Sequence, residues 1–302
     1  MTTRLLINGK KAGLEEVRNA VFTLRKEGYD IQVRPTWESG DIERLVLEAA
    51  EQGVTRLIAG GGDGTVNEVV DAMLKQAFTD CELAVLPLGT ANDFATACHI
   101  PTDSYYEALK LAVNGKSVSI DVGKANERHF VNIATAGFGA QVTATTPVAL
   151  KNFLGGGAYT LSGLVQAINF QPFKGQVKYD GISKTSHVVV GAICNGKQAG
   201  GGQVLAPNAL LNDGYLEAVA LEEFTPADIP TVIEELTNHQ PFVGKFVKRE
   251  RVKRVEWSSD TVMPINLDGE PISELNVVIS VIPSAIRLVV PEDCPLIGKV
   301  SA

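Results

Sequence analysis

One glycine-rich segment of this 302-residue chain carries residue types that bind phosphate. The segment Gly60–Glu68 reads GGGDGTVNE and directly follows a strand-like run, Thr55–Ala59. Glycines let backbone N–H groups approach an anion closely, and the N-terminus of the helix expected from Thr65 adds about half a positive charge. The segment therefore predicts a phosphate cradle, and a tight turn that binds nothing is the alternative.

The acid inside this segment, Asp63, narrows the chemistry further. A carboxylate beside phosphates repels them unless a cation lies between, so Asp63 predicts a divalent metal, Mg²⁺, held by few carboxylates and by the phosphates themselves. Capping of a helix is the alternative role for Asp63. The segment is not a Walker A motif, because no Lys-Ser/Thr pair follows its last glycine, and it does not match GxGxxG.

A second polar segment, Pro87–Ala95, follows the next strand-like run and reads PLGTANDFA. In an open α/β sheet, ligands bind at the carboxyl ends of the strands, and both segments lie at such ends. Helix capping alone explains Asn92 and Asp93 but leaves Gly89 and Thr90 unexplained. The two segments together predict one ligand site.

The elements that must position these segments alternate between strand and helix over the first ~120 residues, as in a parallel sheet with helices on both faces. The expected strands are Arg4–Asn8, Ile31–Pro35, Thr55–Ala59 and Leu83–Leu86. Apolar spacing and capping signals predict the helices Leu14–Glu27, Asp41–Gln52 with Asp41 as the cap, Thr65–Lys75 and Ser104–Asn114.

Strand-like runs dominate the chain after about residue 123, which is typical of a β-sandwich. The runs are Phe130–Ala134, Gln176–Tyr179, His187–Cys194, Leu216–Leu221, Arg251–Trp257, Met263–Leu267, Val277–Ile282 and Ile286–Val290. One helix is expected to start at Thr225, and another lies within Lys151–Phe170. The fold class is therefore an α/β domain, with a parallel sheet and helices on both faces, plus a β-sandwich second domain.

Composition excludes several classes of protein. The chain has 27 Lys+Arg and 35 Asp+Glu, a formal net charge of −8, which argues against a nucleic-acid partner. Its four cysteines are scattered without a CxxC pair, so reduced thiols in a cytosol are the plain interpretation. We find no apolar run long enough to span a membrane and no signal peptide.

The segments Gly60–Glu68 and Pro87–Ala95 resemble the diacylglycerol kinase catalytic-domain family, and most closely the bacterial YegS-like lipid kinases. The resemblance runs nearly end to end. It includes Asn195-Gly196 with Gly200–Gly202, then Pro207–Gly214, then Leu267–Pro271. It implies a nucleotide-binding domain at residues 1–122, with the tail 291–302 packed on it, and a β-sandwich lipid-kinase domain at 123–290.

The resemblance also implies which residues bind the nucleotide and metal. The ATP contacts would be Thr36, Gly62, Asp63, Gly64, Thr65, Val66, Asn67, Glu68 and Thr90. A structural Mg²⁺, or Ca²⁺, in the second domain would be held by the Asp213 carboxylate and by the backbone carbonyls of Leu210 and Tyr215. From the residues alone, Asn212-Asp213-Gly214 is first a turn signal.

Phosphoryl transfer to a lipid hydroxyl depends on positioning, on charge neutralisation and on a carboxylate that accepts the hydroxyl proton late in the transfer. The segment Leu267–Glu270 offers Asp268 and Glu270, which a strand-turn could present to one cleft. A plain Asp-Gly hairpin turn is the alternative. The resemblance favours Glu270 as the proton acceptor, with Asp268 as runner-up or partner.

The lipid side is represented by two features. Leu161, Leu164, Val165 and Ile168 follow helical spacing, which is usually a core pattern, and Gly155–Gly157 before them would let that helix move and expose a lipid slot. A basic cluster, which we call the 245–254 cluster, would attract anionic headgroups or form a solvated hairpin face. Its members are Lys245, Lys248, Arg249, Arg251, Lys253 and Arg254.

The sequence thus predicts an ATP- and Mg²⁺-dependent lipid kinase that acts on a membrane glycerolipid, of diacylglycerol or phosphatidylglycerol type. It would be a cytoplasmic protein, peripheral at the inner membrane face during turnover. An NAD kinase and a catalytically silent nucleotide or lipid sensor are the alternatives. The presence of both Asp63 and Glu270 counts against a silent protein.

Overall fold

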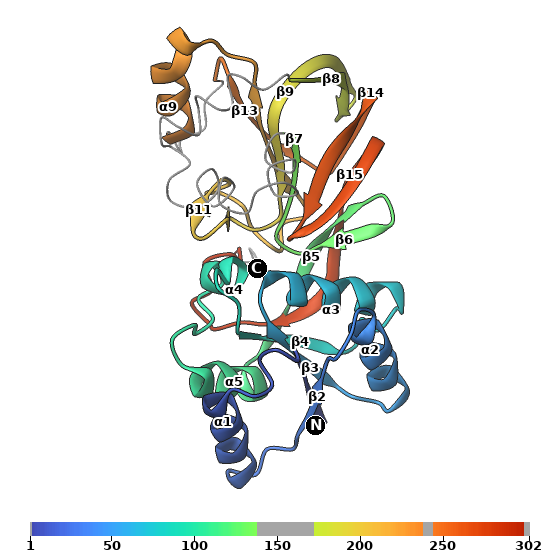
Figure 1. The fold of residues 1–302 in the computed structure, drawn as a ribbon, viewed down its shortest axis with the longest axis vertical. Coiled ribbons are helices and arrows are strands. Elements are labelled where there is room, and N and C mark those ends of the chain that lie inside the picture. Colours follow the sequence, from blue (N-terminus) through green and yellow to red (C-terminus); the bar gives the residue numbers. More distant parts are fainter. Residues whose placement is uncertain (1, 138–171, 238–243, 299–302) are drawn as a thin grey trace.

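The computed structural model describes residues 2–137, 172–237 and 244–298. Two lobes follow one another along its long axis: an α/β lobe that contains the N-terminus and a lobe built mostly of strands (Figure 1). The helix expected within Lys151–Phe170, including Gly155–Gly157, lies outside the described residues.

Four parallel strands form the sheet of the first domain, in the order β4-β3-β1-β2. The strands are β1 (Thr3–Ile7), β2 (Ile31–Pro35), β3 (Arg56–Gly61) and β4 (Glu82–Pro87). Every residue of β1 and of β3 is buried, as expected for parallel strands covered on both faces. Their carboxyl ends face the second domain (Figure 1).

Helices cover both faces of this sheet (Figure 1). One apolar core joins the sheet to α1 (Glu15–Lys26) and α5 (Tyr105–Asn114). The other core joins it to α2 (Asp41–Glu51), α3 (Asp63–Lys75) and the short α4 (Asp93–Ala97). Helix α3 begins at Asp63, two residues before the expected start at Thr65, so the glycine-rich segment includes its first turn.

The expected role of Asp41 as a helix cap is wrong. Gly40 holds the N-cap position in a left-handed conformation (φ 87°), and Asp41 is the first helical residue. The Asp41 carboxylate instead accepts hydrogen bonds from the backbone N–H groups of Trp37 (2.6 Å) and Glu38 (3.1 Å) in the loop before the helix. Asp41 therefore fixes the β2–α2 loop.

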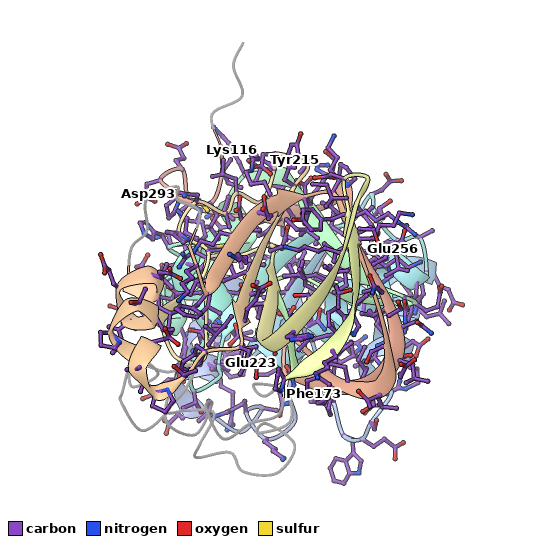
Figure 2. All side chains as sticks on the ribbon, turned by 90° about the horizontal axis from the view of Figure 1, so that it is seen from above. Lys116, Phe173, Tyr215, Glu223, Glu256 and Asp293 are labelled. Atoms are coloured by element: carbon purple, nitrogen blue, oxygen red, sulfur yellow. The ribbon has the colours of Figure 1, made fainter. Side chains whose placement is uncertain are left out.

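Antiparallel strands of the second domain continue the same sheet, and they curve around their core when seen from above (Figure 2). Tyr215 and Glu256 lie near the outline of the molecule in that view. The strands are β5 (Ser117–Ala125), β6 (Arg128–Phe130), β7 (Ile133–Gly137), β8 (Phe173–Tyr179), β9 (Ile182–Cys194), β12 (Leu216–Glu222), β13 (Val247–Val252), β14 (Arg254–Leu267) and β15 (Glu270–Val289). The helical turn η1 (Pro226–Asp228) and α9 (Ile229–Thr237) follow Thr225, as expected, while β10 (Gln198–Ala199) and β11 (Gln203–Val204) form a separate hairpin.

The long strand β15 connects the two domains. It pairs antiparallel with β14 and β5, and its end pairs parallel with β4 through Arg287 and Leu288. The two runs expected at 277–282 and 286–290 are thus one strand with an irregularity between them, where Ser284 has φ 51°. Likewise, the runs expected at 251–257 and 263–267 lie largely within β14, whose register shifts between Ser258 and Met263. Cys294 and Leu296, after β15, join the core of the first domain.

Candidate active site

A cleft of about 310 Å³ lies where the carboxyl ends of β3 and β4 meet the second domain. From the first domain it is lined by Gly62, Asp63, Gly64, Gly89, Thr90 and Asp93. From the second domain it is lined by Asn132, Ile133, Thr135, Ala199, Gly200, Asn266, Asp268 and Gly269. The fold therefore places the glycine-rich segment, the Pro87–Ala95 segment and the Leu267–Glu270 turn around one space.

The glycines of the Gly60–Glu68 and Pro87–Ala95 segments differ in what their surroundings require. A Cβ on Gly61 would lie 2.3 Å from the Thr65 hydroxyl oxygen, and a Cβ on Gly89 would lie 2.6 Å from the Cα of Gly62, so these positions are required by packing. The Cβ of a residue at 64, by contrast, would meet only the Asp268 carbonyl oxygen, at 3.8 Å. Gly64 is thus free of steric demands from the protein itself and leaves the cleft open.

Asp63 does cap a helix, but that helix is α4 of the neighbouring segment. Its two carboxylate oxygens accept the backbone N–H groups of Asp93 (3.2 Å) and Phe94 (3.0 Å). Burial raises the pKa of Asp63, and the nearby Asp93 carboxylate adds to the shift. The sequence offered metal binding and capping as alternatives, and the capping interaction that the structure shows links the Gly60–Glu68 segment to the Pro87–Ala95 segment.

Asp93 extends this chain of contacts into the second domain. Its carboxylate accepts the backbone N–H groups of Gly201 (2.9 Å) and Gly202 (2.6 Å), in the loop between β10 and β11. Both glycines have a positive φ, so glycine suits the turn that presents these two groups. The sequence had suggested Asp93 only as a capping residue. The position of Asp93 in the PLGTANDFA segment, which resembles the kinase family, was the sequence signal that could have indicated a larger role.

Asp268 is buried and held by its surroundings. Together with Gly269 it forms a two-residue hairpin turn with φ values of 50° and 105°, which is the conformation that Asp-Gly favours between β14 and β15. The carboxylate accepts the backbone N–H groups of Val131 (2.7 Å), Asn132 (3.0 Å) and Ile133 (2.6 Å). Burial raises its pKa to about 7, against the opposing effect of these hydrogen bonds.

Glu270 lies at the start of β15, next to this turn, and is only half-buried. Its charge contributes to raising the pKa of Glu68 on α3, for which burial is the larger cause. The charges of Glu68 and Glu270 therefore repel each other across the domain boundary. Asp268 lines the cleft together with Asp63 and Asp93, whereas Glu270 is not among the lining residues.

Thr36 and Glu68 line a second hollow, which adjoins the carboxyl ends of β1 and β2. The Thr36 hydroxyl accepts the backbone N–H of Gly9 at 3.1 Å. Of the remaining residues expected at the nucleotide, Thr65 packs on Gly61, and Val66 and Asn67 are buried side chains of α3. Neither Val66 nor Asn67 lines the cleft or the second hollow.

The residues expected to bind a structural metal are arranged differently from a preformed metal site. One Asp213 oxygen accepts the backbone N–H of Tyr215 (3.0 Å), and the other pairs with the Arg251 guanidinium at 2.6 Å. Arg251 also contacts Glu217 at 3.2 Å, and it lies over the Tyr215 ring. Because Arg251 already neutralises the carboxylate, a metal at Asp213 would have to compete with it. Within the described residues, no cluster of three or more His, Cys, Asp and Glu side chains suits a metal ion.

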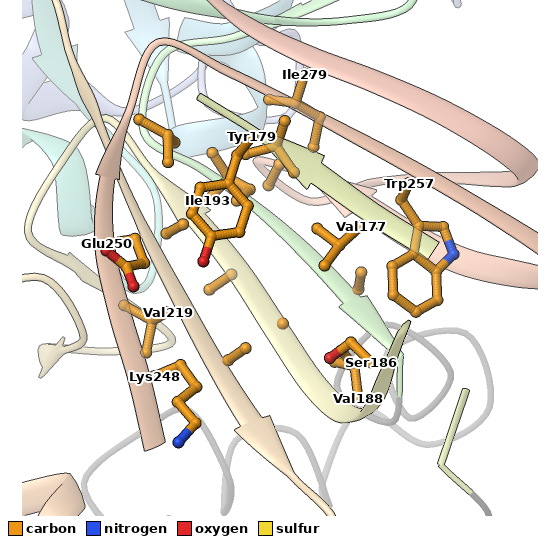
Figure 3. A pocket seen from close by; sticks show the side chains of 18 of the residues that line it. Val177, Tyr179, Ser186, Val188, Ile193, Val219, Lys248, Glu250, Trp257 and Ile279 are labelled. Carbon is orange, nitrogen blue, oxygen red and sulfur yellow. The ribbon is translucent and has the colours of Figure 1, made fainter. Parts of the chain in front are cut away.

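An apolar cavity of about 130 Å³ lies inside the curved sheet of the second domain (Figure 3). Side chains of β8, β9, β13 and β14 surround it, including Val177, Tyr179, Ile193 and Trp257. Cross-strand pairing places Ala136, Gly191 and Ala220 in one row of its wall, so small residues create the space. Thr135 of β7 borders both this cavity and the polar cleft.

Comparison with known proteins agrees with this arrangement. The profile of the diacylglycerol kinase catalytic domain matches residues 2–125, and that of the YegS C-terminal NAD kinase beta sandwich-like domain matches residues 132–290. The chain therefore combines a kinase catalytic domain with a β-sandwich-like domain, and it belongs to the YegS-like lipid kinase family.

Individual relatives cover nearly the whole chain. A protein of Shewanella frigidimarina named "Probable lipid kinase YegS-like" is 48% identical over 97% of this chain and 94% of its own length. A protein of the same name from Chromohalobacter salexigens is 44% identical over 98% and 95%. The crystal structure of a diacylglycerol kinase from Bacillus anthracis shares the fold, with a TM-score of 0.73 at 21% identity, covering 97% of this chain and 98% of that chain.

Proposed function

We propose that the cleft transfers the γ-phosphate of ATP to a hydroxyl of a membrane glycerolipid, of diacylglycerol or phosphatidylglycerol type. The protein is thus a phosphotransferase with an alcohol acceptor, in keeping with its family. The observation that carries the proposal is the meeting of both phosphate segments with Asp268 in one cleft, with Glu270 beside it. A phosphoryl group and a proton acceptor are what this reaction must bring together.

For the nucleotide, we assign the phosphates to the glycine-rich segment, with Thr90 at the other wall and Thr36 and Glu68 in the adjoining hollow. The first turn of α3 offers unpaired N–H groups and the positive end of the helix dipole. A bound Mg²⁺ would neutralise charge on the phosphates. Asp63 lies on the cleft wall, and it would hold such an ion together with the phosphate oxygens.

For the proton, we favour Glu270 as the acceptor and Asp268 as the group that holds the turn. The Asp268 oxygens already accept three backbone N–H groups, so its geometry is fixed and most of its accepting capacity is in use. Glu270 follows Asp268 by two residues on the same hairpin and is half-buried. A carboxylate with access to solvent can take up a proton and release it to water.

For the lipid, the apolar cavity offers space for acyl carbons, and it adjoins the cleft at Thr135.

The 245–254 cluster is less available to lipid headgroups than its sequence suggested, because its cations have partners within the protein. Lys245 pairs with Asp228, Lys248 donates to Gly244, Arg249 to Glu235, Arg251 pairs with Asp213 and Arg254 with Glu256, while Lys253 lies over the Tyr215 ring.

None of the helices in the described segments has the length and apolarity to cross a membrane. We propose action from the cytoplasmic side at a membrane surface.

The experiment that tests this function offers γ-labelled ATP and Mg²⁺ with separate acceptors. Diacylglycerol, phosphatidylglycerol and a sphingoid base in mixed micelles are compared with NAD and with no acceptor. Transfer to a glycerolipid supports the proposal. Label in NAD alone would establish the NAD kinase alternative, and ATP binding without transfer to any acceptor would establish a sensor.

A further inference from the structure

Trp37 displays its indole ring to solvent from a fixed position. Its residue is 95% exposed, while the next most exposed large hydrophobic residue among the described ones, Val262, is 53% exposed. The Trp37 backbone is nevertheless held, since its N–H donates to Asp41 Oδ2 at 2.6 Å. Arg44 holds the other Asp41 oxygen at 2.6 Å and, with the backbone N–H groups of the loop, lowers the pKa of Asp41 to about 2. The ring is therefore presented by a firm loop, not by a flexible tip.

The position of this loop relates it to the nucleotide. Trp37 lines the same hollow as Thr36 and Glu68, at the carboxyl end of β2. The ends of β1 and β2 approach so closely there that a Cβ on Gly9 would lie 2.0 Å from the Thr36 carbonyl oxygen. Strand order β3-β1-β2 puts this hollow two strand spacings, about 10 Å, from the end of β3 where the phosphate cradle begins. That is the scale on which the base of a nucleotide is separated from its terminal phosphates.

We propose that Trp37 is the stacking platform for the purine base of ATP. The inference rests on the proposed function and adds a binding residue to it. Every base has a π-face, so an exposed indole beside a phosphate site suits stacking without any hydrogen-bond code. The contacts of Asp41 have already ordered the backbone of Trp37, so that stacking would have to order only the side chain.

The surroundings of the ring favour a base over a membrane surface. Glu38 and Glu68 line the same hollow against one cation, Lys10, and this acidic excess would repel an anionic headgroup layer. The purine end of a nucleotide carries no negative charge and meets no such repulsion. Trp37 thus borders a polar, partly acidic hollow, and insertion of its ring into lipid would bring those acids to the membrane.

The test compares wild type with Trp37→Ala, Trp37→Phe and a matched control, Phe22→Ala. Phe22 is another exposed aromatic residue of the first domain, on α1, and it does not line the hollow. Trp37→Ala should weaken ATP binding by about 5- to 150-fold, and Trp37→Phe by less, because loss of one base–aromatic stack is worth about that factor. Inorganic tripolyphosphate, which has no base, should bind all four proteins alike.

Fluorescence supplies a readout that needs no turnover. ATP should change the indole emission of wild type but not of Trp37→Phe, in which Trp257 is the remaining tryptophan. Unchanged ATP affinity in Trp37→Ala would overturn the stacking proposal while leaving the kinase function intact. So would weaker binding of that variant to phosphatidylglycerol vesicles at unchanged ATP affinity. If wild type bound no ATP at all, the proposed function itself would fail.

Discussion

Substitution of Gly64 by alanine separates what the glycine-rich segment does for the ligand from what it does for the fold. Gly64 is the second residue of α3, and an added Cβ would meet only the Asp268 carbonyl oxygen, at the ordinary contact distance of 3.8 Å. Alanine in place of glycine in a helix is worth about 0.5–1 kcal/mol. We therefore expect Gly64→Ala to raise the thermal midpoint by about 1–4 °C.

The same methyl group would protrude into the cleft, where the phosphate must approach the backbone. Loss of one hydrogen bond to a charged group costs about 1.5–3 kcal/mol, so the dissociation constant for ATP should rise by about 10- to 150-fold. Calorimetry with ATP and with tripolyphosphate measures this, and Gly13→Ala, whose Cβ meets no atom within 4 Å, is the control. Wild-type affinity in the stabilised Gly64→Ala protein would refute the phosphate cradle.

Three further predictions concern other parts of the molecule. Burial raises the pKa of Asp268 to about 7, above the ~3.9 of an unfolded Asp, so its stabilising contribution is full below about pH 4 and is lost as pH rises towards 7. The thermal midpoint of wild type should therefore fall more steeply between about pH 4 and 7 than that of Asp268→Asn, and equal slopes would contradict this. Asp213→Ala should lower thermal stability and abolish any stabilisation by added Mg²⁺ or Ca²⁺; identical melting curves for the variant and wild type, with and without chelator, would remove the metal from that site. Gly191→Leu should fill the apolar cavity and exclude about two methylenes of a long acyl chain, which should lower kcat/KM about tenfold for long-chain but not for short-chain lipids. Gly191→Ala is the graded control, and equal effects on both chain lengths would exclude the cavity as an acyl site.

Much of the first domain could be predicted because its signals are local. The run of β1 is apolar on both faces, and Gly28 follows the helix at Leu14–Glu27, so the strand and the helix were both placed within about a residue. The start of α3 was placed too late. Glycine has a low helix propensity, so the sequence gives no helix signal at Gly64. In the structure the backbone is already helical from Asp63, because Thr65 packs onto Gly61 and Gly62 packs onto Gly89.

The relations between segments could not be read from spacing. Asp63 reaches α4, Asp93 reaches Gly201 and Gly202, and Asp268 reaches residues 131–133, and each link joins parts of the chain that are distant in sequence. Capping preferences identify a carboxylate that accepts N–H groups, but they do not say which helix or turn it serves. The runs expected at 277–282 and 286–290 were not recognised as one strand for a related reason. The sequence shows the interruption near Ser284, but it does not show that β15 pairs with β5 on both sides of that interruption.

The central claim is that this cleft transfers phosphate to a lipid hydroxyl with Glu270 as the proton acceptor, and single-turnover transfer by Glu270→Gln tests it most directly. General-base catalysis contributes about 10²–10⁴-fold, so the rate of transfer from γ-labelled ATP to the glycerolipid should fall by that factor. ATP affinity should stay near wild type, because Glu270 belongs to β15 while the assigned phosphate contacts belong to the first domain. Glu68→Gln, which alters the facing carboxylate on α3, is the matched comparison. A wild-type rate of transfer in Glu270→Gln would contradict the assignment of the proton acceptor, and absence of transfer to any lipid by wild type that binds ATP would contradict the account as a whole.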